Sequence, residues 1–194
     1  MKHSPDFILA SGSPRRKQLL SDAGFSFEVK TVAFEETFPE EMDVSEVAEF
    51  LARGKNQAHR EVYNDEVILT ADTVVIFNDH ILGKPENEAE AIRTLGMLSG
   101  QSHQVVTGVC ISSPHSKQMF SVETEVKFRM LQSSEIAHYV HAYKPFDKAG
   151  SYAIQEWIGL IGVEWIKGSF YNVVGLPVLE VSQTLQNDFG IKPT

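Results

Sequence analysis

The sequence predicts a mixed α/β fold with a partly antiparallel sheet. Two kinds of pattern alternate along the chain: apolar residues at helical spacing, and short runs rich in β-branched residues. Some strand-like runs follow one another directly, as they do in hairpins. The composition, with 42% hydrophobic and 22% charged residues over 194 positions, is that of a globular protein with a substantial core. One large domain or two small lobes, built from helices and a mixed sheet, satisfies these observations.

The N-terminal half is expected to begin with a buried strand at 7–10, an apolar run that ends in a glycine turn. Ser13 is a suitable N-cap, and Pro14 a suitable first residue, for a helix that ends near Gly24. The other elements expected in this half are a strand at 25–32, a helix at 43–63 and a strand at 66–77.

The C-terminal half begins with a turn, which Asn78 and Asp79 predict. Ser133 or Ser134 is expected to cap a later helix. The stretch 144–177 is rich in turn residues and contains two strand candidates. The other elements expected are a strand at 81–83, a helix at 87–98, paired strands at 104–112 and 120–130, and helices ending near 143 and 189.

Charge and cysteine content exclude several classes of partner. The chain carries 17 basic and 26 acidic residues, a net charge of −9, so long-range attraction to nucleic acid or to an anionic membrane is not expected. The single cysteine, Cys110, lies among apolar residues; it can form no internal disulfide, supplies no zinc framework and is expected to be a buried strand thiol. Residues 1–6 are polar and the apolar run after them is too short for an export signal or a membrane span, which predicts a cytoplasmic protein.

The first candidate site is the basic turn at 11–17, Ser-Gly-Ser-Pro-Arg-Arg-Lys. A strand leads through this turn into a helix N-terminus, where free backbone N–H groups and the positive end of the helix dipole attract anions. Three cations in the first helical turn oppose that dipole, and a bound anion such as phosphate would explain them. The alternative is a solvated basic turn. The spacing is not that of a P-loop.

Asp72 is the second candidate, because it lies within a β-branched strand at 69–76. Burying a carboxylate there is costly unless it is paired or binds a metal. The alternative is a strand-end residue that faces water. Glu35 and Glu36 follow the second expected strand and could supply a second acid, although two adjacent glutamates are usually part of a solvated turn.

Isolated lysines and loops are weaker candidates. Lys55 lies on the helix at 43–63 and Lys84 lies between a strand and a helix; lysines in such places are usually surface charges. The loop at 145–155 could line a cleft or be an ordinary loop, and 172–177 is interpreted as a strand end followed by a turn. The seven histidines show no metal-ligand spacing.

Taken together, several segments resemble the Maf family of nucleoside triphosphate pyrophosphatases. They occur in the family's order and span about residues 7–180, nearly the whole chain. No single motif is decisive, but the ordered set is highly specific. The matching segments are 9–16 followed by Leu19-Leu20, 71–75, 82–85, 98–100 with 103–105 and 107–109, 147–155, and 172–177.

The resemblance implies an ITPase-like α/β fold: an elongated mixed β-sheet flanked by helices, with two lobes and a central cleft, in a single domain over residues 1–194. It implies hydrolysis of a nucleoside triphosphate to the monophosphate and pyrophosphate, which limits incorporation of non-standard nucleotides. It also implies Mg²⁺ or Mn²⁺ as cofactor and a homodimer.

Site residues follow from the same resemblance. Asp72 would accept the proton of the attacking water and also hold metal, and Glu36 would be a metal ligand, with Glu35 as the alternative. The substrate-binding positions that the resemblance implies are Ser11, Ser13, Arg15, Arg16, Lys55, Thr73, Lys84, Lys148 and Gln155.

Within the family, the chain resembles the branch that prefers dTTP and UTP rather than the one that prefers 7-methyl-GTP. Arg15, Thr73 and Gln155 are the positions tied to base specificity in that branch, and the Gln155 amide can offer a donor and an acceptor to a pyrimidine. The family usually has glycine directly after this glutamine and again two residues later. This chain continues with Glu156 and Trp157, which could alter the loop or the base selectivity.

Two other functions are weighed against this one. A nucleotide-binding regulator of septum formation or cell division, acting through a partner protein, fits the same resemblance; the intact Asp72, Lys84 and basic turn favour turnover. A neighbouring ITPase-like purine triphosphatase is disfavoured by the Ser-Pro-Arg-Arg turn and by the Asp-Lys-Ala-Gly run at 147–150.

Overall fold

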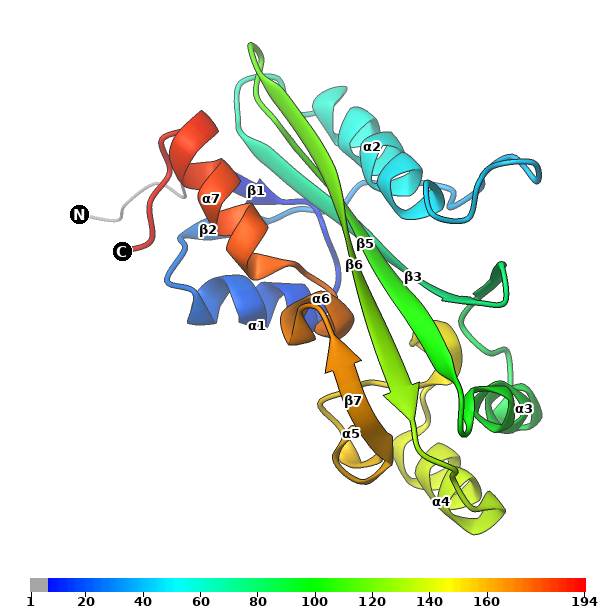
Figure 1. Cartoon of the computed structure of the whole chain (residues 1–194). Helices are drawn as coiled ribbons and strands as arrows, with labels where there is room; N and C mark the ends of the chain where they lie inside the picture. The colour runs from blue at the N-terminus through cyan, green and yellow to red at the C-terminus, as the bar shows by residue number, and fades with distance from the viewer. Residues whose placement is uncertain (1–6) are drawn as a thin grey trace. The chain divides into compact units, whose positions relative to one another are not determined.

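The computed structural model describes residues 7–194. The polar segment 1–6, which contributed to the expectation of a cytoplasmic protein, lies outside the described residues. A seven-stranded mixed sheet runs through the described chain in the order β2-β1-β3-β5-β6-β7, and β4 pairs with β3 (Figure 1). β1 is parallel to β2 and β3, whereas the β3–β4 and β6–β7 pairs are antiparallel. The predicted mixed α/β class is confirmed.

The strands and helices alternate along the chain as expected. The strands are β1 Phe7–Leu9, β2 Phe27–Val29, β3 Ile68–Phe77, β4 His80–Leu82, β5 Ser102–Ser112, β6 Lys117–Phe128 and β7 Val163–Lys167. The α-helices are α1 Pro14–Asp22, α2 Val47–Arg60, α3 Glu88–Leu98, α4 Ser133–Tyr143, α5 Trp157–Gly162, α6 Phe170–Val174 and α7 Val178–Asp188, and a 3₁₀ turn, η1, covers Ala149–Ser151.

The chain folds into two compact units. The first unit comprises the chain up to Asp72, Thr107–Val122 and Gly175–Thr194. The second unit comprises Thr73–Val106 and Glu123–Val174. The boundaries fall inside β3, β5 and β6, so that each of these strands contributes residues to both units.

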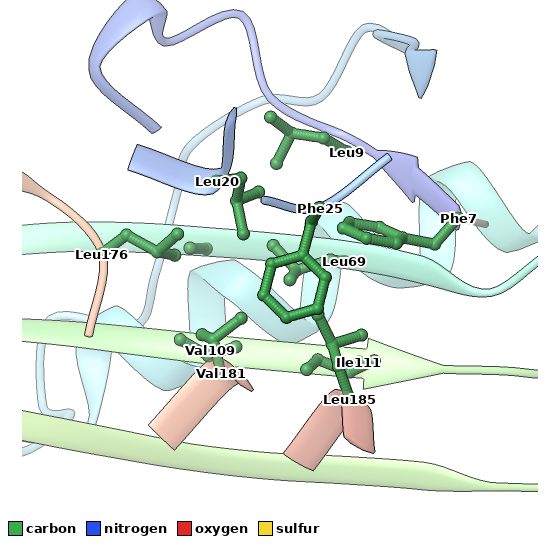
Figure 2. Close-up of a cluster of buried hydrophobic side chains, with 11 residues drawn as sticks. Phe7, Leu9, Leu20, Phe25, Leu69, Val109, Ile111, Leu176, Val181 and Leu185 are labelled. Atoms are coloured by element: carbon green, nitrogen blue, oxygen red, sulfur yellow. The ribbon is translucent and has the colours of Figure 1, made fainter. Parts of the chain in front are cut away.

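One core of the first unit packs helices α1 and α7 against one face of the sheet. Successive side chains of a strand point to opposite faces of the sheet, so residues two apart share a face. Leu69 and Ala71 of β3, and Val109 and Ile111 of β5, therefore lie on the same face as one another within each strand. They meet Leu20 of α1 and Leu185 of α7 in a fully buried cluster (Figure 2). Burying side chains of this size supplies roughly 1.5–3 kcal/mol each, which stabilises the packing of α1 and α7 on the sheet.

Helix α2 covers the opposite face of the first unit. The Thr70 hydroxyl donates to the Ala52 carbonyl at 2.7 Å, and the Asn56 amide donates to the Ile68 carbonyl at 3.1 Å. The helix also lies very close to β5, since a Cβ built on Gly108 would come within 2.3 Å of the α2 backbone. Because Asp72 shares the strand face of Thr70, its carboxylate points toward α2.

The core of the second unit lies between helices α3 and α4 and the strands. Leu95 of α3 and Tyr139 of α4 are fully buried in one cluster with Phe128 of β6. The buried Asn172 amide donates to the Val105 carbonyl and to the Thr124 hydroxyl, both at 3.0 Å, and so ties α6 to β5 and β6. Asn172 therefore has a structural role in this unit.

Most of the expected elements are confirmed, and three details are wrong. Ser13 caps α1, and Cys110 is a buried thiol as expected. The N-cap of α4 is Gln132 rather than Ser133 or Ser134, because the Glu135 carboxylate accepts the Gln132 N–H at 2.8 Å. Within 144–177 only one strand forms, β7, and the rest includes the short helices α5 and α6. The interpretation of 172–177 as a strand end is wrong, because residues 172–174 belong to α6. No helix formed by residues 7–194 is both long enough and apolar enough to cross a bilayer.

Candidate active site

The turn before α1 is held by its own hydroxyl groups. The Ser13 Oγ accepts the Arg16 N–H at 3.4 Å, as an N-cap should. The Ser11 Oγ accepts the Ser13 N–H and one Arg16 guanidinium N–H, both at 3.3 Å. Ser11 and Ser13 thus hold together a turn whose helix has no acidic residue in its first turn. Because these hydroxyl groups bond the Ser13 and Arg16 N–H groups, what the turn offers to an anion is the positive end of the α1 dipole and the cations that follow Pro14.

Arg16 is a cation of this turn whose orientation is fixed by hydrogen bonds. Its Nε donates to the Gly175 carbonyl at 2.8 Å. Burial lowers the pKa of Arg16, and the nearby Arg15 lowers it further, whereas the negative charges of Asp72 and Glu36 raise it. The guanidinium therefore lies within electrostatic range of both carboxylates.

Two carboxylates of the first unit converge on one ammonium. The Lys55 Nζ lies 2.8 Å from the Asp72 Oδ2 and 2.5 Å from the Glu36 Oε1. The side chains of Asp72 and Lys55 are only 13% and 16% exposed, so this is a largely desolvated ion pair. The interpretation of Lys55 as a surface charge is wrong. Asp72 is partnered, as a buried strand carboxylate requires.

Helix α2 also positions the segment that carries Glu36. His59 accepts the Val32 N–H through Nε2 at 3.0 Å, while its Nδ1 donates to the Lys55 carbonyl at 2.8 Å. Phe34 lies against Gly54, where a Cβ would come within 2.5 Å of the ring. Two contacts with α2 thus hold the segment that precedes Glu36, and the ion pair with Lys55 favours Glu36 over Glu35 as the acid beside Asp72.

The paired carboxylates fit a divalent cation that is held jointly with a phosphate. Among residues 7–194 no cluster of three or more His, Cys, Asp or Glu side chains could hold a metal by itself. Mg²⁺ usually keeps several waters and binds through one or two carboxylates plus substrate phosphates. Glu36 and Asp72, whose oxygens approach one cation already, supply that donor set.

In the second unit, Lys148 is nearly buried among acidic groups. Its Nζ lies 2.7 Å from the Asp147 Oδ1 and 3.5 Å from the Glu156 Oε1. The other Glu156 oxygen accepts the hydroxyl of Tyr139. Lys148 is therefore held in place by the protein itself.

Three further predicted residues belong to the second unit. Thr73 lies in β3 and is half-buried, and Lys84 follows β4 and is exposed. Gln155 is exposed, directly before the Glu156 N-cap of α5. The structure thus brings together Arg16 with the Glu36, Lys55 and Asp72 cluster, and separately Lys148 with its acidic neighbours.

Comparison with known proteins decides the family. The family model described as Maf-like protein matches residues 6–188. The chain belongs to the family of Maf-like proteins. Proteins named dTTP/UTP pyrophosphatase are similar to it: one from Phocaeicola vulgatus is 51% identical over 88% of this chain and 90% of the relative, and one from Porphyromonas gingivalis is 48% identical over 94% of each. A solved structure of the Staphylococcus aureus Ham1 protein matches 63% of this chain and 71% of that one, with a TM-score of 0.44 and 16% identity.

Several residues of this Maf-like chain support the site without having been predicted. Gly54 and His59 hold the Glu36 segment, and Tyr139 holds Glu156. Gly54, directly before Lys55, was the available signal, because glycine within a helix costs about 1 kcal/mol relative to alanine and often marks a close approach. His59 and Tyr139 carry no comparable signal, since their partners are distant in sequence.

Proposed function

We propose that this Maf-like protein hydrolyses dTTP and UTP, together with modified pyrimidine triphosphates, to the monophosphate and pyrophosphate, and so limits incorporation of non-standard nucleotides. The observation that carries the proposal is the buried carboxylate of Asp72. It is paired with Lys55, which also contacts Glu36, and it lies within electrostatic range of Arg16. The names of the well-covering relatives support the choice of substrates.

Asp72 is the proposed base. Water attacking the α-phosphorus must lose a proton, and a carboxylate accepts it if it is held in the charged form at a fixed position. Lys55 fixes the Asp72 carboxylate at 2.8 Å from its ammonium. Because Lys55 is also paired with Glu36, the ammonium that orients the base is itself held in place before substrate arrives.

The basic turn is the proposed phosphate clamp. Negative charge builds on the pyrophosphate leaving group, which requires cations and aligned N–H donors. The N-terminus of α1 supplies the positive end of the helix dipole, Ser11 and Ser13 shape the turn, and Arg15 and Arg16 supply positive charge. Lys84 and Lys148 are proposed to add positive charge toward the phosphates.

Glu36 and Asp72 are the residues that would hold Mg²⁺ or Mn²⁺. When bound, the ion supplies positive charge that polarises the phosphoryl group and stabilises the leaving group. Arg15, Thr73 and Gln155 are proposed to select the base, with the Gln155 amide offering a donor and an acceptor to the pyrimidine edge. The homodimer and the cytoplasmic location expected from the sequence stay predictions.

A panel of triphosphates tests the proposed function. Purified protein with Mg²⁺ or Mn²⁺ is given dTTP, UTP, CTP, GTP, 7-methyl-GTP, 5-methyl-UTP and ITP, and pyrophosphate release is measured. Rapid release from dTTP, UTP and 5-methyl-UTP, with little from the purine nucleotides, is expected. Preference for 7-methyl-GTP would keep the reaction and reject the pyrimidine branch. Nucleotide binding without release from any member of the panel would reject hydrolysis and favour the regulator of septum formation.

A further inference from the structure

Glu156 stands at the centre of a hydrogen-bonded group in the second unit. One oxygen of its carboxylate accepts the hydroxyl of Tyr139, and the other lies 3.5 Å from the Lys148 Nζ. Tyr139 and Lys148 are both buried. A carboxylate between a buried hydroxyl and a buried ammonium is constrained from two sides, unlike a surface glutamate.

The Tyr139 hydroxyl connects this carboxylate to the loop backbone. Its oxygen accepts the Ala153 N–H at 3.1 Å while its hydrogen is donated to Glu156. Burial, and secondarily the hydrogen bond to Glu156, raises the pKa of Tyr139, so the hydroxyl keeps the proton that it donates. The chain of contacts therefore runs from Glu156 through Tyr139 to the backbone two residues before Gln155.

Lys148 has two carboxylate neighbours that differ in how firmly they are held. Asp147 is nearer, at 2.7 Å, but its side chain is mostly exposed, and exposed ion pairs restrain a lysine weakly. Glu156 is only 24% exposed and is anchored by Tyr139. Of the two carboxylates, Glu156 is therefore the one positioned to keep the Lys148 ammonium inside the protein.

We propose that Glu156 is a positioning residue for nucleotide hydrolysis, which holds the Lys148 ammonium where it binds the triphosphate. This inference rests on the proposed function, in which Lys148 contacts the phosphates. It assigns a role to a glutamate that stands where the family usually has glycine. Glu156 itself is not proposed to touch the nucleotide.

The test combines charge removal with a double-mutant cycle. Glu156→Gln keeps an acceptor for Tyr139 and removes the charge beside Lys148. We expect it to raise KM for dTTP about tenfold, the loss of a charge-assisted contact, with kcat changed less than about threefold. In a Lys148→Met background the same change is expected to alter KM by less than about twofold, because a residue that acts through another has no effect once that other is gone.

A matched control and a second variant complete the set. Glu135 is 26% exposed, lies in the same unit and is paired with Arg129 at 2.8 Å, so Glu135→Gln removes a comparable ion pair elsewhere and is expected to leave KM unchanged. Tyr139→Phe keeps the Glu156 charge and removes its anchor, and is expected to raise KM by at least about threefold. Thermal unfolding of each variant verifies that the protein measured is folded.

Binding of a non-hydrolysable α,β-imido analogue of dUTP separates the two hypotheses. If wild-type protein releases no pyrophosphate, the proposed function fails, and the Kd of this analogue still tests Glu156. A Kd about tenfold weaker in Glu156→Gln, but not in Glu135→Gln, supports the positioning role. An unchanged KM and Kd in Glu156→Gln, or an equal effect of that change with and without Lys148, would overturn it.

Discussion

Lys55 is the residue on which the proposed site depends most, because its ammonium contacts both Asp72 and Glu36. Two carboxylates this close would repel each other without a cation between them. The Lys55 ammonium supplies that positive charge, with one oxygen of each carboxylate in contact with it. The preference of the fold for Glu36 over its neighbour Glu35 follows from this contact, and a matched pair of variants tests it.

Glu36→Gln is expected to raise the Mg²⁺ concentration for half-maximal pyrophosphate release by at least about tenfold, because a neutral amide is a poorer ligand for a hard cation. Glu35→Gln, which removes the same charge one residue earlier, is expected to leave that concentration within about twofold. Metal titration of both variants gives the answer. Equal effects in the two variants would reject the assignment of Glu36.

Gln155→Ala is expected to blunt base discrimination more than it slows the reaction. Loss of hydrogen bonds to the base edge lowers the dTTP-to-GTP ratio of kcat/KM by about tenfold, while the rate at saturating GTP changes little. Gln101→Ala removes an exposed glutamine elsewhere in the second unit and serves as the control. A dTTP-to-GTP ratio equal to that of wild type in Gln155→Ala would contradict the assignment.

At the scale of elements, helix α2 determines where the Glu36 segment lies. Its Gly54 gives room to Phe34, and its His59 accepts the Val32 N–H. A comparison of two helical glycines tests this role. A Cβ at Gly54 would meet the Phe34 ring, whereas a Cβ at Gly96 of α3 would meet nothing within 4 Å.

Gly96→Ala is expected to stabilise the protein by about 0.5–1 kcal/mol, the usual gain of alanine within a helix, with unchanged activity. Gly54→Ala is expected to lose that gain to the clash and to lower kcat/KM for dTTP by at least about threefold, because it displaces the segment before Glu36. Urea unfolding and pyrophosphate release measure both. Full activity in Gly54→Ala would show that this packing does not position the site.

The elements and residues that could be predicted from the sequence are those that depend on neighbouring residues in the chain. The α1 cap follows from Ser13 and Pro14, and the partnered state of Asp72 follows from the cost of burying a carboxylate in a strand. The partner itself could not be predicted, because Lys55 has the pattern of an ordinary helix lysine until α2 packs on the sheet. Helices α5 and α6 were missed because they are too short to show periodicity.

At the scale of the whole molecule, acid stability depends on His103. Its Nε2 shares a 2.7 Å hydrogen bond with the Tyr152 hydroxyl, and its ring stacks on Phe128. Burial lowers the pKa of His103 from 6.5 to about 4. Between these two values the unfolded chain binds a proton that the folded protein excludes, so the stabilisation present above pH 6.5 is lost as the pH falls toward 4.

His103→Gln is expected to flatten the acid side of the stability curve. Between pH 7 and pH 4.5, the free energy of unfolding should fall by about 2–3 kcal/mol more in wild type than in this variant. His115→Gln changes an exposed histidine and should retain the wild-type dependence. Urea unfolding at the two pH values provides the measurement. Parallel stability curves for wild type and His103→Gln would contradict the prediction.

The chain carries a net charge of −9, yet its proposed substrate is a highly charged anion. Binding must therefore rely on local positive groups, for which the basic turn and the lysines are proposed, while Asp72 is proposed to act on the water and to share the metal with Glu36. Because the proposed phosphate-binding cations are other residues, we expect the base to be removable without loss of dTTP binding.

Pyrophosphate release from dTTP by Asp72→Asn, measured beside wild type, tests the proposed chemistry most directly. The amide keeps the shape of the carboxylate and cannot accept the proton. We expect release to fall by at least about a thousandfold, within the range of a lost general base that also holds metal, while the protein stays folded and still binds dTTP. Asp22→Asn, an exposed change on α1, should release at the wild-type rate. Release from Asp72→Asn at the rate of wild type would contradict the assignment of Asp72 as the catalytic base.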